Sequence, residues 1–453
     1  MSLEVIILAA GKGTRMRSDM PKVLHTLAGK PMLVHAVEQA QKLAPTRTHI
    51  IVGHGADQVE AQVKPLGAQC VPQEQQLGTG HAVAQAMPNV DSEATVLVLY
   101  GDVPLVPAAL MQQLADQAMQ GGLAILTVAL DDSTGYGRIV RNDQGEIQAI
   151  VEHKDATPEQ RQIKEINTGI LAAKASLLNG WLPRIESDNA QGEIYLTDIV
   201  AMAVADGVPI SHLQPEFAQQ TQGVNDRVQL AELERWHQLQ LANQLLRDGV
   251  QLADPSRFDL RGELTTGKDI FIDINAIIEG QVVLEDGVHI GPNCHLKDAH
   301  IGAGTHVFAN SVIDQARVAK HCNIGPFARL RPGTVLEDGA KVGNFVETKK
   351  TTLGKGSKAN HFTYLGDTVV GEKVNIGAGT ITCNYDGVNK FQTNIEDGAF
   401  IGSNSSIVAP VTIGAGATVG AGSTITKDVA DNNLAIARGK QRNLASWAKP
   451  VKS

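Results

Sequence analysis

Glycines and cations cluster directly after the first apolar stretch of the chain. Residues 5–10 are apolar, the string GKGTRM follows at residues 11–16, and Lys22 stands close behind. A glycine-rich turn after a strand exposes backbone N–H groups that bind phosphate oxygens, and nearby cations add to that attraction. Neither the G-K-[ST] offset of a Walker A loop nor the third glycine of a dinucleotide fingerprint is present. From these residues alone, phosphate binding and an ordinary strand-to-helix turn stay equally open.

A carboxylate stands at the end of another apolar stretch. Residues 95–100 are followed by Gly101 and Asp102, and open α/β sheets bind ligands at the carboxyl ends of their strands. Magnesium takes one or two oxygen ligands from a protein and completes its shell with substrate phosphates and water. Asp102 is therefore a candidate ligand, although an aspartate at such a position, taken alone, is more often a plain turn residue.

A second group of reactive side chains lies much further along the chain. Arg331, Lys349 and Lys350 could bind an anionic group, whereas any single lysine is more often explained by a solvated face. His361 stands in the string KANHFTY. A neutral imidazole there could remove the proton that an amine loses as it attacks a thioester, but a lone histidine more often has no catalytic role.

Alternating apolar and helix-like stretches in the first half predict an α/β layer with a largely parallel sheet that positions the first of these groups. Residues 226–248 carry apolar residues at a helical period without Gly or Pro, which predicts a connecting helix. The predicted strands cover residues 5–10, 49–52, 95–100, 124–130, 147–151 and 166–172, and the predicted helices cover residues 31–43 and 107–119.

Beyond about residue 255, aliphatic residues recur every six positions and are often followed by Gly, which predicts a parallel β-helix of hexapeptide repeats. Breaks in the repeat fall between Leu296 and Ile301 and at residues 383–394, where a protruding loop is expected. The inward positions are predicted to be Ile272, Ile278, Leu284, Ile290 and Leu296, then Val312, Val318, Ile324, Leu330, Leu336 and Val342, and then Ile395, Ile401, Ile407, Ile413, Val419 and Ile425.

Length and composition limit the possible functions. A chain of 453 residues is expected to form two or three folding units. Its net charge of -9 gives no global basic field, so we expect neither nucleic acid nor a membrane surface as a partner. The 4 cysteines are far apart and predict neither a zinc site nor a disulfide framework. We see neither a charged leader nor an apolar run long enough to cross a membrane, and we therefore expect a cytoplasmic protein.

Several strings in the first half resemble the sugar-1-phosphate nucleotidyltransferases. With the repeats added, the whole chain is similar to the bacterial bifunctional UDP-N-acetylglucosamine pyrophosphorylases and glucosamine-1-phosphate N-acetyltransferases. The resemblance implies a Rossmann-like nucleotidyltransferase domain at residues 1–225, a linker helix at 226–250 and a left-handed parallel β-helix acetyltransferase domain at 251–453. The strings are LAAGKGTRM with Pro21 and Lys22, Gln73 with QLGTG, YGDVP, Gly135 to Arg138, Glu152 to Lys154, Asn167 to Gly169, and Gly223 to Asn225.

The same resemblance implies two reactions. Glucosamine 1-phosphate would be acetylated by acetyl-CoA, and UMP would then pass from UTP to the product, giving UDP-N-acetylglucosamine and pyrophosphate for cell-envelope synthesis. In the first domain, Arg15 and Lys22 would face phosphates, while Asp102 and Asn225 would bind Mg²⁺. The nucleotide would meet Leu8, Ala9, Ala10, Gly11, Gln73, Gly78 and Thr79, and the sugar would meet Tyr100, Gly137, Glu152, Asn167 and Asn225.

In the second domain, the resemblance implies that His361 is the general base and that the enzyme is a homotrimer with sites between neighbouring subunits. Departures from the family pattern are small: Asn360 precedes the base, and Gly439-Lys440 follows Arg438. They bear on coenzyme affinity at most. Glucosamine 1-phosphate would be held by Arg331, Lys349, Tyr364, Asn375 and Asn384, and acetyl-CoA by Ala378, Tyr385, Ser403, Ala421 and Arg438.

Two other functions compete with the bifunctional enzyme. One is a single sugar nucleotidyltransferase whose β-helix is only structural or regulatory. The polar residues on the repeats argue against it, because a purely structural β-helix has no need of Arg331, Lys349 and His361 together. The other is a non-catalytic scaffold that binds a sugar nucleotide, which the coincidence of Asp102 and Asn225 disfavours.

Overall fold

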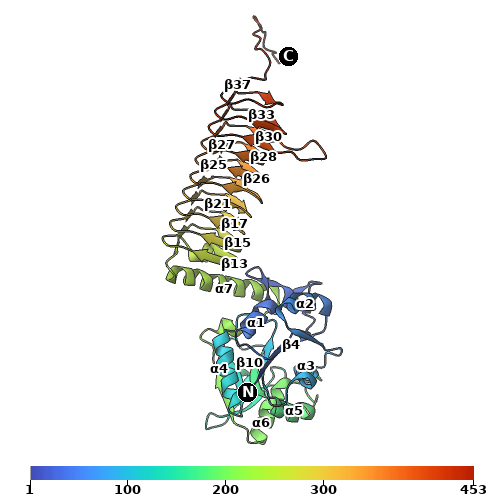
Figure 1. Ribbon diagram of the computed structural model, residues 1–453. Helices are drawn as coiled ribbons and strands as arrows, with labels where there is room; N and C mark the ends of the chain where they lie inside the picture. Colours follow the sequence, from blue (N-terminus) through green and yellow to red (C-terminus); the bar gives the residue numbers. More distant parts are fainter. Residues whose placement is uncertain (1, 453) are drawn as a thin grey trace. The chain divides into compact units, whose positions relative to one another are not determined.

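The computed structural model describes residues 2–452, which fall into two compact units. The division lies between Trp236 and His237, inside a long helix. Figure 1 shows the first unit as helices around a sheet and the second as a stack of short strands. Over residues 2–452, no helix has the length and the apolar character needed to cross a membrane.

The first unit is built on a mixed sheet in the order β11-β7-β10-β6-β1-β4-β5. Its strands are parallel apart from β10, which runs antiparallel to both β6 and β7 and also carries the hairpin β8-β9. The predicted largely parallel sheet is therefore confirmed with β10 as its exception. The strands are β1 (Leu3–Leu8), β4 (Arg47–Val52), β5 (Gln69–Pro72), β6 (Thr95–Tyr100), β7 (Leu123–Ala129), β8 (Arg138–Arg141), β9 (Ile147–Val151), β10 (Glu165–Lys174) and β11 (Ile210–Leu213), with β2 (Thr26–Leu27) and β3 (Lys30–Pro31) as a separate ribbon.

Both faces of this sheet are covered, which explains why its central strands are apolar at consecutive positions. Along β1, Val5 and Ile7 pack into one core cluster while Ile6 and Leu8 pack into another. Each buried side chain of this kind contributes about 1.5–3 kcal/mol. The helices are α1 (Met32–Gln41), α2 (Ala56–Val63), α3 (Thr79–Ala86), α4 (Ala108–Met119), α5 (Ala175–Trp181), α6 (Ile199–Ala205) and α7 (Arg227–Arg247).

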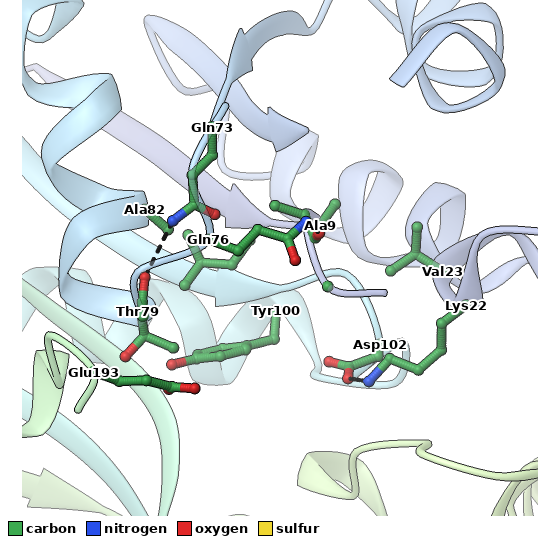
Figure 2. A pocket seen from close by; sticks show the side chains of 14 residues that line it. Ala9, Lys22, Val23, Gln73, Gln76, Thr79, Ala82, Tyr100, Asp102 and Glu193 are labelled. Atoms are coloured by element: carbon green, nitrogen blue, oxygen red, sulfur yellow. Dashed lines mark hydrogen bonds and ion pairs between the residues drawn. The ribbon is translucent and has the colours of Figure 1, made fainter. Parts of the chain in front are cut away.

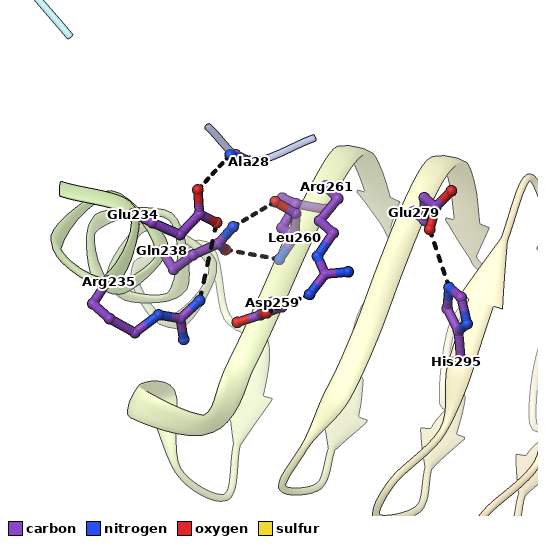
Figure 3. Close-up of polar contacts among 9 residues, drawn as sticks. All are labelled: Ala28, Glu234, Arg235, Gln238, Asp259, Leu260, Arg261, Glu279 and His295. Atoms are coloured by element: carbon purple, nitrogen blue, oxygen red, sulfur yellow. Dashed lines mark hydrogen bonds and ion pairs between the residues drawn. The ribbon is translucent and has the colours of Figure 1, made fainter. Parts of the chain in front are cut away.

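Helix α7 confirms the connecting helix predicted at residues 226–248. Its first part belongs to the first unit, where Leu233 packs against Leu27 and Val224. Its second part belongs to the second unit, where the side chain of Gln238 donates to the carbonyl of Leu260 at 2.9 Å and accepts from its N–H at 2.8 Å (Figure 3). This buried amide is thus satisfied at both ends.

The second unit is a left-handed parallel β-helix. Its strands form two sheets over the described residues. The long strands β15 and β28 each pair with two later strands, and β26 pairs with two earlier ones, because these strands continue round a corner of the coil. The first sheet contains β12 (Gln251–Leu252), β14 (Phe271–Ile272), β16 (His289–Ile290), β19 (His306–Val307), β22 (Asn323–Ile324), β25 (Lys341–Asn344), β27 (Lys358–His361), β29 (Asn375–Ile376), β32 (Phe400–Ile401), β35 (Thr418–Val419) and β37 (Leu434–Ala435). The second contains β13 (Phe258–Thr266), β15 (Ala276–Leu284), β17 (His295–Lys297), β18 (His300–Ile301), β20 (Val312–Asp314), β21 (Arg317–Val318), β23 (Arg329–Leu330), β24 (Val335–Leu336), β26 (Glu347–Leu353), β28 (Tyr364–Val370), β30 (Ile381–Cys383), β31 (Thr393–Ile395), β33 (Ser406–Val408), β34 (Val411–Ile413) and β36 (Thr424–Ile425).

The inward aliphatic positions follow the predicted registers with one correction. Val312 was assigned to the core by its spacing from Val318, but it is 38% exposed, whereas the neighbouring Ile313 is fully buried. The buried residues Ile301, Val307 and Ile313 form a register of their own, and the phase changes by one residue before Val318. Because side chains alternate between the two faces of a strand, a one-residue shift exchanges the buried position for the exposed one.

The expected protruding loop is present between β30 and β31 (Figure 1). Tyr385 and Lys390 pair across it as an antiparallel bridge, and the N–H of Phe391 donates to the carbonyl of Asn384 at 2.9 Å. The insertion is therefore a hairpin whose neck is fixed to the coil.

Candidate functional site

A cavity of about 290 Å³ opens in the first unit where β1 and β6 end (Figure 2). The glycine-rich turn and Asp102 line it together, so the two features that the sequence singled out share one site. The predicted residues in its wall are Leu8, Ala9, Ala10, Gly11, Lys22, Gln73, Gly78, Thr79, Tyr100 and Asp102.

Two residues of the cavity wall, Lys22 and Asp102, meet two further polar side chains, Arg15 and Asn225, beside this cavity. The Lys22 ammonium pairs with the Asp102 carboxylate and also lies 3.3 Å from Oδ1 of Asn225. That same oxygen accepts from Nη2 of Arg15 at 2.9 Å. The N–H of Val224 donates to the Asp102 carbonyl at 2.9 Å, which brings the segment carrying Asn225 alongside β6. The structure thus brings Arg15, Lys22 and both predicted metal ligands together.

This arrangement fits a hard divalent cation. One ammonium nitrogen contacts an oxygen of Asp102 and an oxygen of Asn225, so the two oxygens are close enough to share a single cation. Mg²⁺ prefers such oxygen ligands and needs only one or two from the protein. Within residues 2–452, no cluster of three or more His, Cys, Asp or Glu side chains could hold a metal ion.

The remaining predicted residues of the first unit gather around Tyr100. Burial is the main cause that raises the pKa of its phenol, followed by the charges of Asp102 and Glu152. The Glu152 carboxylate accepts from the hydroxyl of Thr197 at 3.2 Å, and burial raises its pKa as well. The N–H of Asn167 donates to the carbonyl of Gly137 at 2.9 Å, so these two predicted residues are neighbours through their backbones.

Sequence reasoning missed four residues in the cavity wall: Val23, Gln76, Ala82 and Glu193. Gln76 donates from Nε2 to the carbonyl of Ala10 at 2.7 Å, which ties the QLGTG segment to the end of β1. Its place inside that motif was a usable signal. No motif marked Glu193, which comes from a segment more than a hundred residues later.

The glycine at position 78 has a structural reason of its own. Its φ is 121°, and a Cβ there would lie 2.5 Å from the carbonyl oxygen of Ile194. The N–H of Ile194 donates to the Leu77 carbonyl at 2.7 Å, and the N–H of Gly80 donates to the Ile194 carbonyl at 2.8 Å. Residues 189–196, hereafter the strap, therefore dock directly on the loop at 77–80.

In the second unit, several predicted residues stack in one column. Asn344, His361, Ala378, Ser403 and Ala421 occupy the same corner of successive coils. Each of their carbonyls accepts a hydrogen bond from the coil that follows. The bonds are Phe362 N–H to Asn344 (3.1 Å), Gly379 N–H to His361 (3.1 Å), Asn404 N–H to Ala378 (2.7 Å), Gly422 N–H to Ser403 (2.8 Å) and Arg438 Nη1 to Ala421 (2.8 Å).

His361 is exposed at this corner, at the end of β27. Its Nδ1 lies 2.9 Å from Oδ1 of Asn344 in the preceding coil. An amide oxygen can only accept, so Nδ1 carries the hydrogen in this arrangement and Nε2 keeps its lone pair. An imidazole held in this tautomer can accept a proton at Nε2. Asn344 was missed by sequence reasoning because nothing local marks it as the partner of His361.

A cationic patch lies on the adjacent face of the coil. Lys349 lies beside Lys390 of the hairpin, whose ammonium is the main cause that lowers the pKa of Lys349, and Arg331 contributes further. Nη1 of Arg331 pairs with Glu347 at 2.7 Å. Within residues 2–452, no carboxylate forms a direct ion pair with either lysine, and the charge of Asp367 offsets only part of the repulsion at Lys349. A bound anion would relieve the rest. Lys390 is a further residue that sequence reasoning missed.

The other predicted residues of this unit lie nearby in the fold without a direct bond to His361. Asn384 donates from Nδ2 to Asp367 at 2.5 Å, at the neck of the hairpin. Tyr364 begins β28 and Asn375 begins β29, while Tyr385 lies exposed in the hairpin. Within the described chain, no hydrogen bond joins these four residues to the imidazole.

Both halves of the chain match known families. The MobA-like NTP transferase domain matches residues 5–175, and six repeats of the bacterial transferase hexapeptide match residues 392–427. A protein of Marinobacter nauticus called "Bifunctional protein GlmU" is 57% identical over 100% of this chain and 99% of its own length. One of the same name from Cellvibrio japonicus is 59% identical over 99% of each. A solved structure of a UDP-glucose pyrophosphorylase complexed with UDP-glucose is 20% identical, covers 52% of this chain and 98% of its own, and has a TM-score of 0.43.

Proposed function

This chain belongs to the family of the bifunctional GlmU proteins, and from that premise we propose how its two units share the work. It is a bifunctional enzyme with uridyltransferase and acetyltransferase activities. It acetylates glucosamine 1-phosphate and then transfers UMP from UTP to N-acetylglucosamine 1-phosphate, giving UDP-N-acetylglucosamine and pyrophosphate. We assign nucleotidyl transfer to residues 1–225, a linker to 226–250 and acetyl transfer to 251–453.

Nucleotidyl transfer takes place in the cavity of the first unit. The meeting of Arg15 and Lys22 with Asp102 and Asn225 supports this assignment most strongly, because two anionic substrates must be brought together there. Leu8, Ala9, Ala10, Gly11, Gln73, Gly78 and Thr79 hold the nucleotide, and Tyr100, Gly137, Glu152, Asn167 and Asn225 hold the sugar.

The chain's own groups position and neutralise the reactants. An oxygen of the sugar phosphate attacks the α-phosphorus of UTP, the new O–P bond forms, and the bond to the β-phosphate breaks to release pyrophosphate. Arg15 and Lys22 offset the negative charge that gathers at the reacting phosphorus. Mg²⁺ held by Asp102 and Asn225 supplies further neutralisation when it is bound. The Lys22 ammonium, which contacts both side chains in this structure, would then pair with a substrate phosphate.

Acetyl transfer takes place at the corner that carries His361. The amine of glucosamine 1-phosphate attacks the thioester carbon of acetyl-CoA, the C–N bond forms, and the C–S bond breaks. Nε2 of His361 takes the proton from the amine and the thiolate of coenzyme A leaves. Arg331, Lys349, Tyr364, Asn375 and Asn384 hold the sugar phosphate, with Lys390 as a further cation, and Ala378, Tyr385, Ser403, Ala421 and Arg438 hold the coenzyme.

We also propose that the enzyme is a cytoplasmic homotrimer in which neighbouring β-helices complete each acetyl transfer site. Exposed Phe327, Phe345 and Phe362, whose rings stack at 5.2 Å along one corner, support a covered lateral surface. A single nucleotidyltransferase with a structural β-helix is disfavoured by the polar column at this same corner, which the aliphatic core does not require.

The test is to supply glucosamine 1-phosphate, acetyl-CoA, UTP and Mg²⁺ and to measure UDP-N-acetylglucosamine and pyrophosphate. The two activities should separate, because their groups lie in different units. His361→Ala should abolish acetyl transfer and leave pyrophosphate release from UTP and N-acetylglucosamine 1-phosphate near the wild-type rate. Asp102→Ala should do the reverse. Loss of both activities in either folded variant would contradict the assignment.

A further inference from the structure

Glu193 is the one acidic side chain in the cavity wall to which no role has been given. Its side chain lies in the same wall as Thr79 and Tyr100 (Figure 2). It is half-buried, and within residues 2–452 its carboxylate makes no hydrogen bond or ion pair. A partly desolvated carboxylate without a partner is unfavourable in the free protein, and a donor supplied by a ligand would offset that cost.

The strap holds Glu193 firmly in this position. Asn189 accepts from the N–H of Glu193 at 3.2 Å and donates from Nδ2 to its carbonyl at 2.6 Å. The next residue, Ile194, exchanges backbone hydrogen bonds with the loop at 77–80. The N–H of Leu196 donates to the hydroxyl of Thr79 at 3.1 Å. The carboxylate is thus presented by an anchored backbone on both sides, rather than by a free loop.

The cavity holds a cation at one end, where Lys22 pairs with Asp102, and the unpaired carboxylate of Glu193 elsewhere in its wall. Figure 2 draws the pair Lys22 and Asp102 away from Glu193, which lies near Thr79 and Tyr100 in that view. The charge of Glu193 also contributes to the raised pKa of Glu152, so the two carboxylates are within electrostatic reach of each other. A sugar 1-phosphate carries its negative charge at one end and hydroxyl donors over the rest of the ring. Carboxylates accept from hydroxyls and repel phosphates.

We propose that Glu193 is a further substrate-contacting residue of the nucleotidyl transfer site, which accepts hydrogen bonds from hydroxyls of the sugar 1-phosphate and fixes its orientation. The phosphate is then directed toward Lys22 and Arg15 by attraction at one end and by repulsion from Glu193 at the other. This inference rests on the function proposed for the first unit.

The test compares Glu193→Gln with the wild type and with Glu186→Gln. Glutamine keeps the size of the side chain and removes its charge. Glu186 is an exposed residue shortly before the strap and outside the cavity wall, so its substitution makes the same charge change at a matched position. Pyrophosphate release is measured with Mg²⁺ while N-acetylglucosamine 1-phosphate is varied at saturating UTP, and then while UTP is varied at saturating sugar phosphate.

A hydrogen bond to a charged group corresponds to about a 10-fold or larger change in an equilibrium constant. Glu193→Gln should therefore raise KM for the sugar phosphate by about 10-fold or more, leave KM for UTP within about 2-fold, and unfold at a temperature no lower than that of Glu186→Gln, because the substitution removes an unpartnered charge. A sugar KM within about 2-fold of wild type, or equal changes in both KM values, would overturn the inference.

A further variant covers the case in which Glu193→Gln does not fold. Glu193→Asp keeps the charge on a shorter side chain, and its sugar KM should lie between those of the wild type and a folded charge-deleted variant such as Glu193→Ala. A wild-type protein that released no pyrophosphate would instead defeat the function proposed for the first unit. The two failures are therefore distinguishable.

Discussion

Replacing Gly78 with alanine tests how the strap is held against the nucleotide loop. Two effects oppose the substitution. The backbone at this position has a φ of 121°, which L side chains rarely adopt, and the new Cβ would lie 2.5 Å from the carbonyl oxygen of Ile194. The unfavourable φ strains the loop itself, and the close contact with Ile194 pushes the strap away from the loop.

The magnitudes of these effects predict local opening. Backbone strain of this kind amounts to about 1–3 kcal/mol. Detaching the part of the strap around Ile194, while Leu196 stays bonded to Thr79, removes the hydrogen bonds between Ile194 and Leu77 and between Gly80 and Ile194, each with a net contribution of about 1 kcal/mol. Losing about 2 kcal/mol of hydrogen bonding is easier than compressing a contact to 2.5 Å. We therefore expect the strap of Gly78→Ala to detach while the rest of the first unit stays folded.

Gly121→Ala is the matched control. Gly121 also has a positive φ, of 100°, but a Cβ there would meet nothing within 4 Å. The unfolding temperature of both variants should fall, by roughly 2–4 °C for each kcal/mol of lost unfolding free energy. In Gly78→Ala alone, hydrogen exchange at the amides of Ile194 and Gly80 should accelerate, by roughly 30-fold for about 2 kcal/mol. The rate of nucleotidyl transfer should fall in the same variant.

Equal exchange rates at these two amides in both variants would refute this reasoning. The contact with Ile194 would then carry no energy, and Gly78 would be needed for its backbone conformation alone. A fall in nucleotidyl transfer without faster exchange would point instead to a direct clash between the new methyl group and the nucleotide.

Three further predictions concern the core, the pH dependence of stability and acetyl transfer. Ile313→Ala should destabilise the second unit by about 2–5 kcal/mol in urea unfolding, while Val312→Ala should stay within about 1 kcal/mol; the reverse order would restore the register read from the sequence. Burial raises the pKa of Glu152, so the stability linked to this group is present below its ordinary titration range and is lost as pH rises through the raised value. Glu152→Gln should therefore gain thermal stability relative to wild type as pH rises above the ordinary range of a glutamate, and a difference that does not change with pH would contradict this. Asn344→Ala should lower kcat for acetyl transfer by about 5- to 10-fold, since one net hydrogen bond to His361 is worth about 1 kcal/mol, with KM for glucosamine 1-phosphate unchanged; a change confined to KM would argue against a role in holding the imidazole.

Sequence patterns predicted correctly those elements in which the buried positions follow one regular spacing along the chain. The bounds of β6 and β9 agree with the predicted residues 95–100 and 147–151, and α7 ends within one residue of its predicted limits. The error at Val312 arose where the coil changes phase, because two adjacent aliphatic residues both satisfy a period of six. Only the packed core decides between them.

The candidate sites divide in a similar way. Residues within contiguous strings, such as Gly11 and Asp102, could be found because a family motif marks them. Glu193 and Asn344 could not be found, because each acts through a contact that tertiary structure creates. Glu193 reaches the cavity through the docked strap, and Asn344 meets His361 only because one coil stacks on the next, 17 residues away.

The residues stacked at the corner of the β-helix are spaced at regular intervals along its axis. Neighbouring parallel strands lie about 4.8 Å apart, so His361, Ala378, Ser403 and Ala421 mark off equal steps along the axis. An extended ligand that lies along this corner therefore spans a number of coils that depends on its length. Gain or loss of a complete turn during evolution would reset the distance from the imidazole to the far mark by one such step, while leaving the interior of every other turn intact.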